Sequence, residues 1–318
     1  MKNFSIGNFK LDNVYNPYII AEIGVNHEGD LSLAKKLIKQ AAIAGAHAAK
    51  FQTYKAKTLA SKNSPAYWDQ SKEKTNSQYA LFKKYDKFGD SEYKELAKYC
   101  LKYGIDFLST PFDLEAVDTL SNLVPAFKIA SADITNIPLI KKCAKYKKPI
   151  IMSTGASSLE EISYAVNEIY ATGNQKVILL HCILNYPTTI EKANLNTIKI
   201  LQEKYKDIYI GYSDHVAPHN SDMPALEVAI SMGSVVIEKH FTHNKKLPGN
   251  DHYHAMDKKD LRNFNNKLDN YKLLLGKNFI DLKGQEDARL HARRSIFSQG
   301  EIKKGDIIQE SSLIAKRP

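Results

Sequence analysis

The feature that most constrains the fold of this chain is a regular alternation of short β-branched runs with amphipathic helical stretches. Seven helical stretches separate eight strand candidates, and an eighth candidate helix follows at about residues 258–275. Several helical stretches end at glycine, a common helix stop signal. This alternation predicts a parallel sheet, and eight units predict an α/β fold of the closed (β/α)8 TIM-barrel type. The strand candidates are Tyr18–Gly24, Ala48–Thr53, Asp106–Phe112, Ala126–Ser131, Pro149–Gly155, Val177–Ile183, Tyr209–His215 and Val235–Phe241.

Two segments interrupt this alternation. Residues 54–90 are long, polar and aromatic, which favours an ordered cover over an active site. After about residue 281 the pattern changes to short strands and turns, too few to bury a core alone. We therefore expect a catalytic barrel over residues 1–281, and a linker with the start of a small β domain over 282–318. A doubly wound open sheet is the alternative, but no GxGxxG follows the first strand candidate.

Composition excludes several classes of protein. No apolar run among the 318 residues approaches the ~18–20 needed for a membrane span, and the first residues lack a signal-peptide core. The three cysteines show no CxxC spacing, which favours a reducing cytoplasm and argues against a disulfide framework. The net charge of +10 comes mainly from lysines spread over polar helix faces, without an arginine-rich stripe. Nucleic-acid binding is therefore not expected, although the positive field could steer an anionic substrate.

Polar residues gather where the strand candidates end. In a TIM barrel, catalytic residues lie at the carboxyl ends of the strands. One polar residue at a strand end would be ordinary, but eight strands that all end in polar residues favour a single active site. The polar residues are Glu22, Lys50, Gln52, Ser109, Thr110, Lys128, Ser131, Ser153, Thr154, His181, Ser213, Asp214, His215, Glu238, Lys239 and His240.

The residue types indicate metal-assisted chemistry on an anion. His215 and His240 end neighbouring strand candidates, and two imidazoles suit a divalent transition metal used as a Lewis acid. Lys50 and Lys128, with nearby hydroxyls, fit a phosphate and a carboxylate. Glu22 is the candidate acid or base. The hydroxyls belong to Thr110, Ser131, Ser153 and Ser213. We expect Asp251 and His252, which follow the last strand candidate, to close over a polyol.

Nine ordered motifs resemble the sialic acid synthases, the nonulosonic acid synthase family. The resemblance runs from about residue 17 to 257, resumes at RRSI and KRP near the end, and is closest to the bacterial legionaminic acid branch. The motifs are AEIGVNHEGD (21–30), KFQT (50–53), STPFD (109–113), KIAS-D (128–133), MSTGAS (152–157), YPT (186–188), GYSDH (211–215), EKHFT (238–242) and PGNDH (248–252).

The resemblance implies an enzyme that condenses phosphoenolpyruvate with an N-acylated six-carbon aldose and releases phosphate. It implies a divalent cation, usually Mn²⁺ with Mg²⁺ or Co²⁺ as alternatives, and a domain-swapped homodimer with a C-terminal antifreeze-like (SAF, β-clip) domain. His215 and His240 would be the metal ligands and Glu22 the catalytic carboxylate. The residues implied for phosphoenolpyruvate are Lys50, Thr110, Lys128, Ser131, Ser153 and Ser213, and those for the sugar are Gln52, Asp133, Tyr186, Asp251 and Arg317.

Two departures bear on the sugar. Asp133 stands where some N-acetylneuraminate-forming members carry Glu, and Asn185 lies one residue later than the Asn of some members. Both favour 2,4-diacetamido-2,4,6-trideoxy-mannose, the precursor of N,N'-diacetyllegionaminic acid, over N-acetylmannosamine. A sialic acid synthase and a pseudaminic acid synthase are the alternatives. The family also continues beyond KRP, so we expect the small domain to be incomplete.

Other function classes predict different behaviour. A metal-dependent aldolase would share the two histidines and the lysines, but it would not release phosphate as the carbon–carbon bond forms. A non-catalytic carbohydrate-binding protein would lack catalytic groups, whereas Glu22 and both histidines are present.

Overall fold

The computed structural model describes residues 4–11, 15–249 and 251–318. The chain divides into two compact units, residues 1–271 and 272–318, and each is described by itself.

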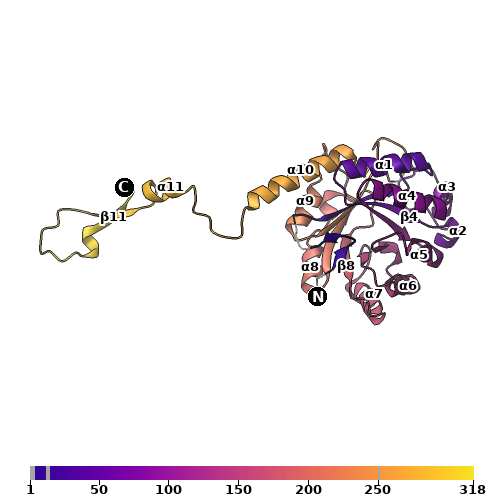
Figure 1. The fold of residues 1–318 in the computed structure, drawn as a ribbon, viewed down its shortest axis with the longest axis horizontal. Coiled ribbons are helices and arrows are strands. Elements are labelled where there is room, and N and C mark those ends of the chain that lie inside the picture. Colours follow the sequence, from indigo (N-terminus) through magenta and orange to yellow (C-terminus); the bar gives the residue numbers. More distant parts are fainter. Residues whose placement is uncertain (1–3, 12–14, 250) are drawn as a thin grey trace. The chain divides into compact units, whose positions relative to one another are not determined.

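The first unit is a nearly closed barrel of eight parallel strands (Figure 1). Hydrogen-bonded neighbours follow the order β5-β4-β3-β10-β9-β8-β7-β6, and β5 and β6 at the two ends lie next to each other. The predicted barrel is confirmed, and every strand lies within two residues of its predicted bounds. The strands are β3 (Tyr18–Gly24), β4 (Ala48–Thr53), β5 (Asp106–Pro111), β6 (Phe127–Ile129), β7 (Ile150–Ser153), β8 (Val177–Cys182), β9 (Tyr209–Asp214) and β10 (Val236–His240).

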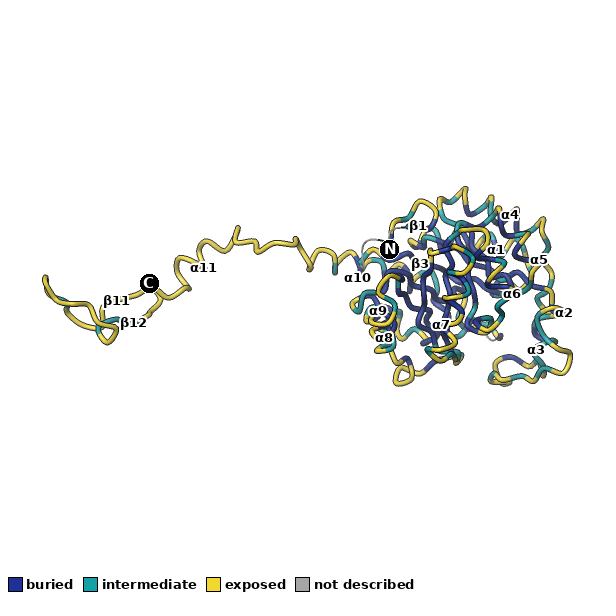
Figure 2. The backbone as a smooth tube through the Cα atoms, turned by 90° about the horizontal axis from the view of Figure 1, so that it is seen from below, coloured by how far each residue is buried: buried dark blue, intermediate teal, exposed yellow. Residues whose placement is uncertain are grey.

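Helices cover the outside of the barrel because the strands are apolar on both faces. Every residue of β3, labelled in Figure 2, is buried, and so is every residue of β8, as expected for a parallel sheet packed inside and out. The outer helices are α1 (Leu31–Ile43), α4 (Asp90–Lys102), α5 (Leu114–Leu120), α6 (Ile137–Lys145), α7 (Leu159–Ala171), α8 (Thr197–Lys204), α9 (Pro224–Ser231) and α10 (Lys258–Leu275).

Local capping sets where several helices begin. The Asp30 carboxylate accepts hydrogen bonds from two backbone N–H groups at the start of α1. Ser158 and Glu161 form a reciprocal capping box at α7. Such caps satisfy donors that the first helical turn leaves unpaired, and they fix the loops leaving the carboxyl ends of the strands.

An N-terminal hairpin closes the base of the barrel. It consists of β1 (Ser5–Ile6) and β2 (Phe9–Lys10), and Ile6 is fully buried. Gly7 turns the hairpin at φ +52°, and a Cβ there would lie 3.2 Å from both carboxylate oxygens of Asp106. Asp106 begins β5 and accepts a 2.6 Å hydrogen bond from Tyr18, the first residue of β3. The Asp106 carboxylate at this end of the barrel is therefore paired with a structural partner.

The long insertion after β4 is an ordered cover, as predicted. It contains α2 (Ala56–Leu59) and α3 (Gln78–Tyr85). Trp68 donates its indole N–H to the backbone oxygen of Glu73, and the buried Glu73 carboxylate lies 3.0 Å from the Lys84 ammonium. These contacts hold the aromatic side chains of the insertion against the cavity described below.

The second unit contains a short helix and a two-stranded antiparallel sheet. The elements are α11 (Glu286–His291), β11 (Ser295–Ser298) and β12 (Leu313–Lys316). All four residues of β11 are exposed. The assignment of residues 282–318 to the start of an antifreeze-like domain stays a prediction. Across the described residues of both units, no helix is long and apolar enough to span a bilayer.

Candidate active site

A cavity of about 330 Å³ lies at the carboxyl ends of the strands. Every predicted phosphoenolpyruvate-binding residue lines it, together with Glu22, both predicted metal ligands and four of the five predicted sugar-binding residues. The fifth, Arg317, belongs to the second unit, so its predicted role is untested. The side chains predicted to form one site therefore line one cavity in the structure.

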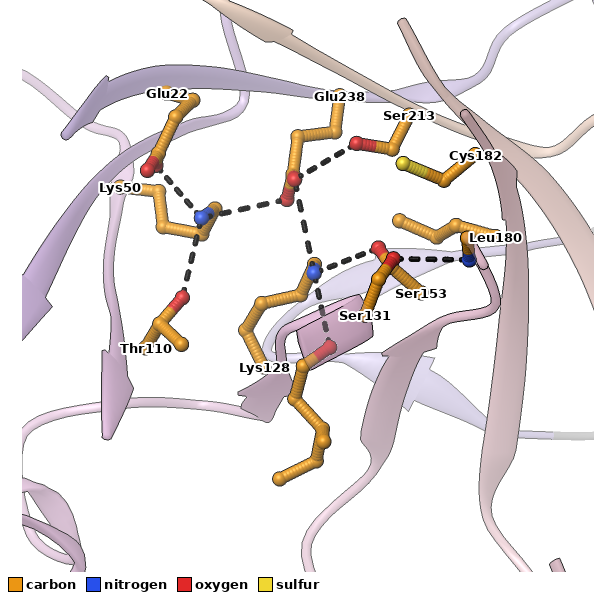
Figure 3. Close-up of polar contacts among 12 residues, drawn as sticks. Glu22, Lys50, Thr110, Lys128, Ser131, Ser153, Leu180, Cys182, Ser213 and Glu238 are labelled. Atoms are coloured by element: carbon orange, nitrogen blue, oxygen red, sulfur yellow. Dashed lines mark hydrogen bonds and ion pairs between the residues drawn. The ribbon is translucent and has the colours of Figure 1, made fainter. Parts of the chain in front are cut away.

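The floor of this cavity is a buried cluster of alternating charges (Figure 3). The Lys50 ammonium lies 2.7 Å from Glu22 Oε2 and 3.6 Å from Glu238 Oε2, and it donates to Thr110 Oγ1 at 3.2 Å. The Lys128 ammonium lies 3.7 Å from Glu238 Oε1. Glu238 therefore bridges the two lysines, and the four charged groups sum to zero.

Hydroxyl groups from three further elements complete the cluster. Lys128 donates to Ser153 Oγ at 2.8 Å, and Ser213 donates to Glu238 Oε1 at 3.1 Å. Ser131 Oγ, at the start of the 3-10 turn after β6, accepts the backbone N–H of Gly155 at 2.9 Å. These hydroxyls surround the lysines from the β6, β7 and β9 side of the barrel.

Burial and the neighbouring charges shift the protonation of this cluster. Burial raises the pKa of Glu22, and Lys50 only partly offsets that effect. Burial alone would lower the pKa of Lys50, but the carboxylates of Glu22 and Glu238 raise it above its usual value. Burial lowers the pKa of Lys128, with Glu238 acting in the opposite direction. Glu22 is thus the carboxylate of the cluster whose surroundings most favour taking up a proton.

Three imidazoles gather beside this charged cluster. The ring centroids of His215 and His240 are 5.5 Å apart, and His254 lies 4.8 Å from His240 and 6.0 Å from His215. Burial lowers the pKa of His215 to about 4 and that of His240 well below its usual value. Both rings are therefore neutral at pH 7, the form that binds a metal.

A buried ion pair holds the His215 segment in place. Lys239 is 2.6 Å from Asp214 and also donates to the Val216 carbonyl, and Tyr212 donates to Asp214 at 2.9 Å. The His215 Nδ1 lies 2.6 Å from the Ile183 carbonyl. An N–H at Nδ1 donating to this carbonyl leaves Nε2 with a free lone pair, the usual arrangement of a metal-bound histidine. The strand-end residues Asp214 and Lys239 are thus positioning groups.

Four of the predicted sugar-binding residues line the cavity, and each contacts another residue of the protein. Gln52 donates to Glu22 at 3.1 Å, and Asp133 accepts from Asn136 at 3.2 Å. The Tyr186 ring lies 4.1 Å from the His215 ring, centroid to centroid, and Asp251 Oδ2 lies 3.7 Å from His240 Nδ1. Asn185, the second of the two departures from the family pattern, is exposed.

Sequence reasoning missed two contributions to this site. Glu238 was recognised as a strand-end residue, but its position between two lysines depends on barrel closure. His254 lies in an irregular segment well beyond the end of β10, so no spacing rule pointed to it. The predicted residue His252 lines the cavity, contacts Thr242 Oγ1 at 2.8 Å and lies 3.5 Å from Glu28. The cavity also has an apolar wall, formed by Tyr54, Leu59, Tyr67, Trp68, Leu81, Phe82, Tyr85, Phe112 and Leu184.

Comparison with known proteins identifies the family. The model of the NeuB family matches residues 37–279. The chain belongs to the NeuB family, the nonulosonic acid synthases. It is therefore an enzyme, a carbon–carbon bond-forming transferase, and the predicted family and enzyme class are confirmed.

Individual NeuB relatives cover almost the whole chain. The chain is 39% identical to the N,N'-diacetyllegionaminic acid synthase of Campylobacter jejuni, over 94% of this chain and 90% of that protein. It is 37% identical to the enzyme of the same name from Legionella pneumophila, over 95% and 85%. The chain is also similar to the crystal structure of an N-acetylneuraminic acid synthetase from Leptospira borgpetersenii in complex with citrate. The TM-score is 0.77 and the sequence identity 32%, over 90% of this chain and 94% of that chain.

Proposed function

We propose that this NeuB protein condenses phosphoenolpyruvate with 2,4-diacetamido-2,4,6-trideoxy-mannose, forming N,N'-diacetyllegionaminic acid and phosphate. The observation that carries the reaction is the buried cluster in which Lys50 and Lys128 flank Glu238 beside Glu22. The sugar is supported by the two similar proteins that bear the legionaminic acid synthase name, and by the aromatic and aliphatic side chains that line the cavity.

The charged cluster suits a substrate that carries both a phosphate and a carboxylate. Two buried ammonium groups and four hydroxyls face the same space, and such donors bind oxyanions strongly when water is excluded. The cluster is electrically neutral when all four groups are ionised, so an entering anion adds negative charge and strengthens the proton affinity of the carboxylates. Glu22, whose pKa burial already raises, is the carboxylate that can accept a proton from water during the reaction.

The residues beside the cluster fit a divalent cation. His215 has its Nδ1 engaged by a carbonyl, while His240 Nδ1 is buried without a hydrogen-bond partner among the described residues. His215 and His240 would hold the ion, with Mn²⁺ proposed and Mg²⁺ or Co²⁺ as alternatives. The ion would supply Lewis acidity toward the aldehyde oxygen of the open-chain sugar.

The residues of the cluster account for the remaining chemistry. The C2=C3 π pair of phosphoenolpyruvate forms the bond from C3 to the aldehyde carbon, and the C=O π pair moves onto the aldehyde oxygen, which becomes a hydroxyl. Water adds to C2 as Glu22 accepts its proton, which balances the proton taken up by that oxygen. The C2–O bond to the phosphate then breaks, its electron pair leaves with the phosphate, and the C2 hydroxyl passes its proton to the phosphate as the keto group forms. Lys50, Lys128 and the serine hydroxyls stabilise the charge that accumulates on this leaving group. The balance is one water consumed and one phosphate released for each new carbon–carbon bond.

The apolar wall bears on the choice of sugar. Trp68 and Phe82 from the insertion, with Leu184 after β8, offer surface to the methyl groups of two acetamido substituents and of C6. N-acetylmannosamine would place hydroxyls against this wall at C4 and C6. Buried hydroxyls without partners are costly, which can give large discrimination between the two sugars.

The direct test measures phosphate release and product mass with both sugars. We expect a kcat/KM for 2,4-diacetamido-2,4,6-trideoxy-mannose at least ~10-fold above that for N-acetylmannosamine, the difference made by about 1.4 kcal/mol. Replacing Trp68 by alanine should narrow this ratio, whereas replacing the exposed Tyr164 of α7 should leave it unchanged. Equal or better use of N-acetylmannosamine would return the chain to the sialic acid alternative, and absence of phosphate release would refute the reaction itself.

We also propose that the active enzyme is a homodimer in which Arg317 reaches the sugar in the partner's barrel. The second unit exposes Ile296, Ile307 and Ile308, apolar side chains that a partner surface would cover. Mixing two inactive variants, Glu22→Gln and Arg317→Ala, should restore activity, because a mixed dimer contains one site with both residues intact. If each arm serves its own barrel, every site keeps one defect and mixing restores nothing.

A further inference from the structure

His254 is a fully buried histidine that lacks the hydrogen bond its burial calls for. Its side chain is 0% exposed, and neither ring nitrogen has a hydrogen-bond partner among the described residues. His254 lies in the segment after β10, and His240 is the last residue of β10. His240, Asp251 and His254 each offer one potential ligand atom, and these three atoms lie within 4.8 Å of one another.

Three other buried histidines in this barrel each have a ring nitrogen that the protein hydrogen-bonds. His181 Nε2 lies 2.8 Å from the Ala193 carbonyl, and His252 Nδ1 lies 2.8 Å from Thr242 Oγ1. His27 Nδ1 accepts the Gly29 N–H at 3.0 Å. A buried polar atom left unpaired costs about 1–3 kcal/mol, so two such nitrogens on His254 need a partner that the protein does not supply.

We propose that His254 is a third imidazole ligand of the divalent cation, in addition to His215 and His240, and that Asp251 completes the group of ligands. This inference rests on the proposed metal site and deepens it, because the sequence pattern provided only two histidine ligands. Neutral imidazole nitrogen is the commonest protein ligand of transition metals. A third such nitrogen favours Co²⁺ or Zn²⁺ over Mg²⁺, which prefers oxygen ligands.

The competing explanation is that His254 only fills space between aromatic rings. Its centroid lies 5.5 Å from that of Tyr186 and 5.2 Å from that of Tyr253, both in edge-to-face geometry. Phenylalanine would serve equally well as such a spacer, because it keeps the ring and removes only the nitrogens. The variant His254→Phe therefore separates a ligand from a packing group.

The experiment titrates metal-stripped full-length protein with Co²⁺ and records both the visible d–d absorption and the bound metal by equilibrium dialysis. We expect His254→Phe and His254→Gln to bind Co²⁺ at least ~10-fold more weakly and to change the absorption spectrum, since even outer-shell partners of a metal typically contribute 10–100-fold in affinity. The matched control is His252→Asn, in the same segment, whose side chain can still hydrogen-bond Thr242 and which should bind Co²⁺ as the parent does. Thermal melts by circular dichroism show which variants are folded at the titration temperature.

The outcomes separate this inference from the proposed function. Unchanged Co²⁺ affinity and spectrum in folded His254→Phe, with loss of binding in His215→Ala and His240→Ala, would overturn the third ligand while keeping the metal site. Absence of Co²⁺ binding by the parent protein would refute the metal site and the third ligand together. If His254→Phe does not fold, the result for His254→Gln decides.

Discussion

The active-site cavity contains two neighbouring groups of side chains that differ in how far the protein itself satisfies them. In the charged cluster, Lys50 has partners in Glu22, Glu238 and Thr110, and Lys128 has partners in Ser153 and Glu238. In the imidazole group, His240 Nδ1 and both nitrogens of His254 lack hydrogen-bond partners among the residues described. The first group is organised before substrate arrives, whereas the second leaves buried ring nitrogens that the proposed cation would occupy.

This difference has an energetic consequence. A buried carboxylate–ammonium network stabilises its own geometry only while every member is present, because removing one charge leaves another buried and unpaired. Unpaired imidazole nitrogens lower stability until a ligand binds, and binding to the native state alone then raises stability. Substitutions in paired groups should therefore affect folding, and substitutions among the imidazoles should affect metal binding and turnover.

The largest effect is expected where a fully buried pair is broken. Lys239 is 1% exposed and lies 2.6 Å from Asp214, so Lys239→Met leaves that carboxylate buried without its cation. We expect the free energy of unfolding to fall by about 3–5 kcal/mol, measured by urea denaturation. The control is Lys142→Met, which breaks an exposed pair with Asp118 and should change stability by less than about 1 kcal/mol. Equal effects of the two substitutions would contradict this view of paired groups.

Substitutions of the imidazoles should reduce turnover rather than the free energy of unfolding. His215→Ala and His240→Ala should lower turnover by at least ~10²-fold if Lewis-acid stabilisation is worth several kcal/mol. Chelation should abolish parent activity, and Mn²⁺ should restore it better than Mg²⁺, because imidazole favours later transition metals. The measurement is phosphate release after dialysis against a chelator and re-addition of each metal. Full activity of both variants in metal-free buffer would refute the proposed metal site.

Much of this arrangement could be predicted from the sequence, for reasons tied to particular residues. The alternation of strands and helices predicts that Glu22, Lys50 and Lys128 lie at one end of the barrel, because the carboxyl ends of parallel strands meet there. The bridging position of Glu238 could not be read this way, since it depends on how far neighbouring strands tilt and on side-chain reach. His254 lies in an irregular segment after the last strand, where no periodicity indicates which side chain turns inward.

The pH dependence of substrate binding should show the smallest effect, and its alkaline side should report on the charged cluster. Burial lowers the pKa of Lys128, so its ammonium loses a proton at lower pH than an exposed lysine does. Since the charged form binds the anion, the KM for phosphoenolpyruvate should rise several-fold as pH increases toward that pKa. On the acid side, kcat should fall as Glu22 becomes protonated at a pKa above its usual value. Lys128→Arg keeps its charge at every accessible pH, so its KM should stay flat on the alkaline side whatever its absolute affinity. An alkaline rise in KM identical in both proteins would mean that Lys128 does not hold the substrate as a cation, and the anion-binding role would then rest on Lys50.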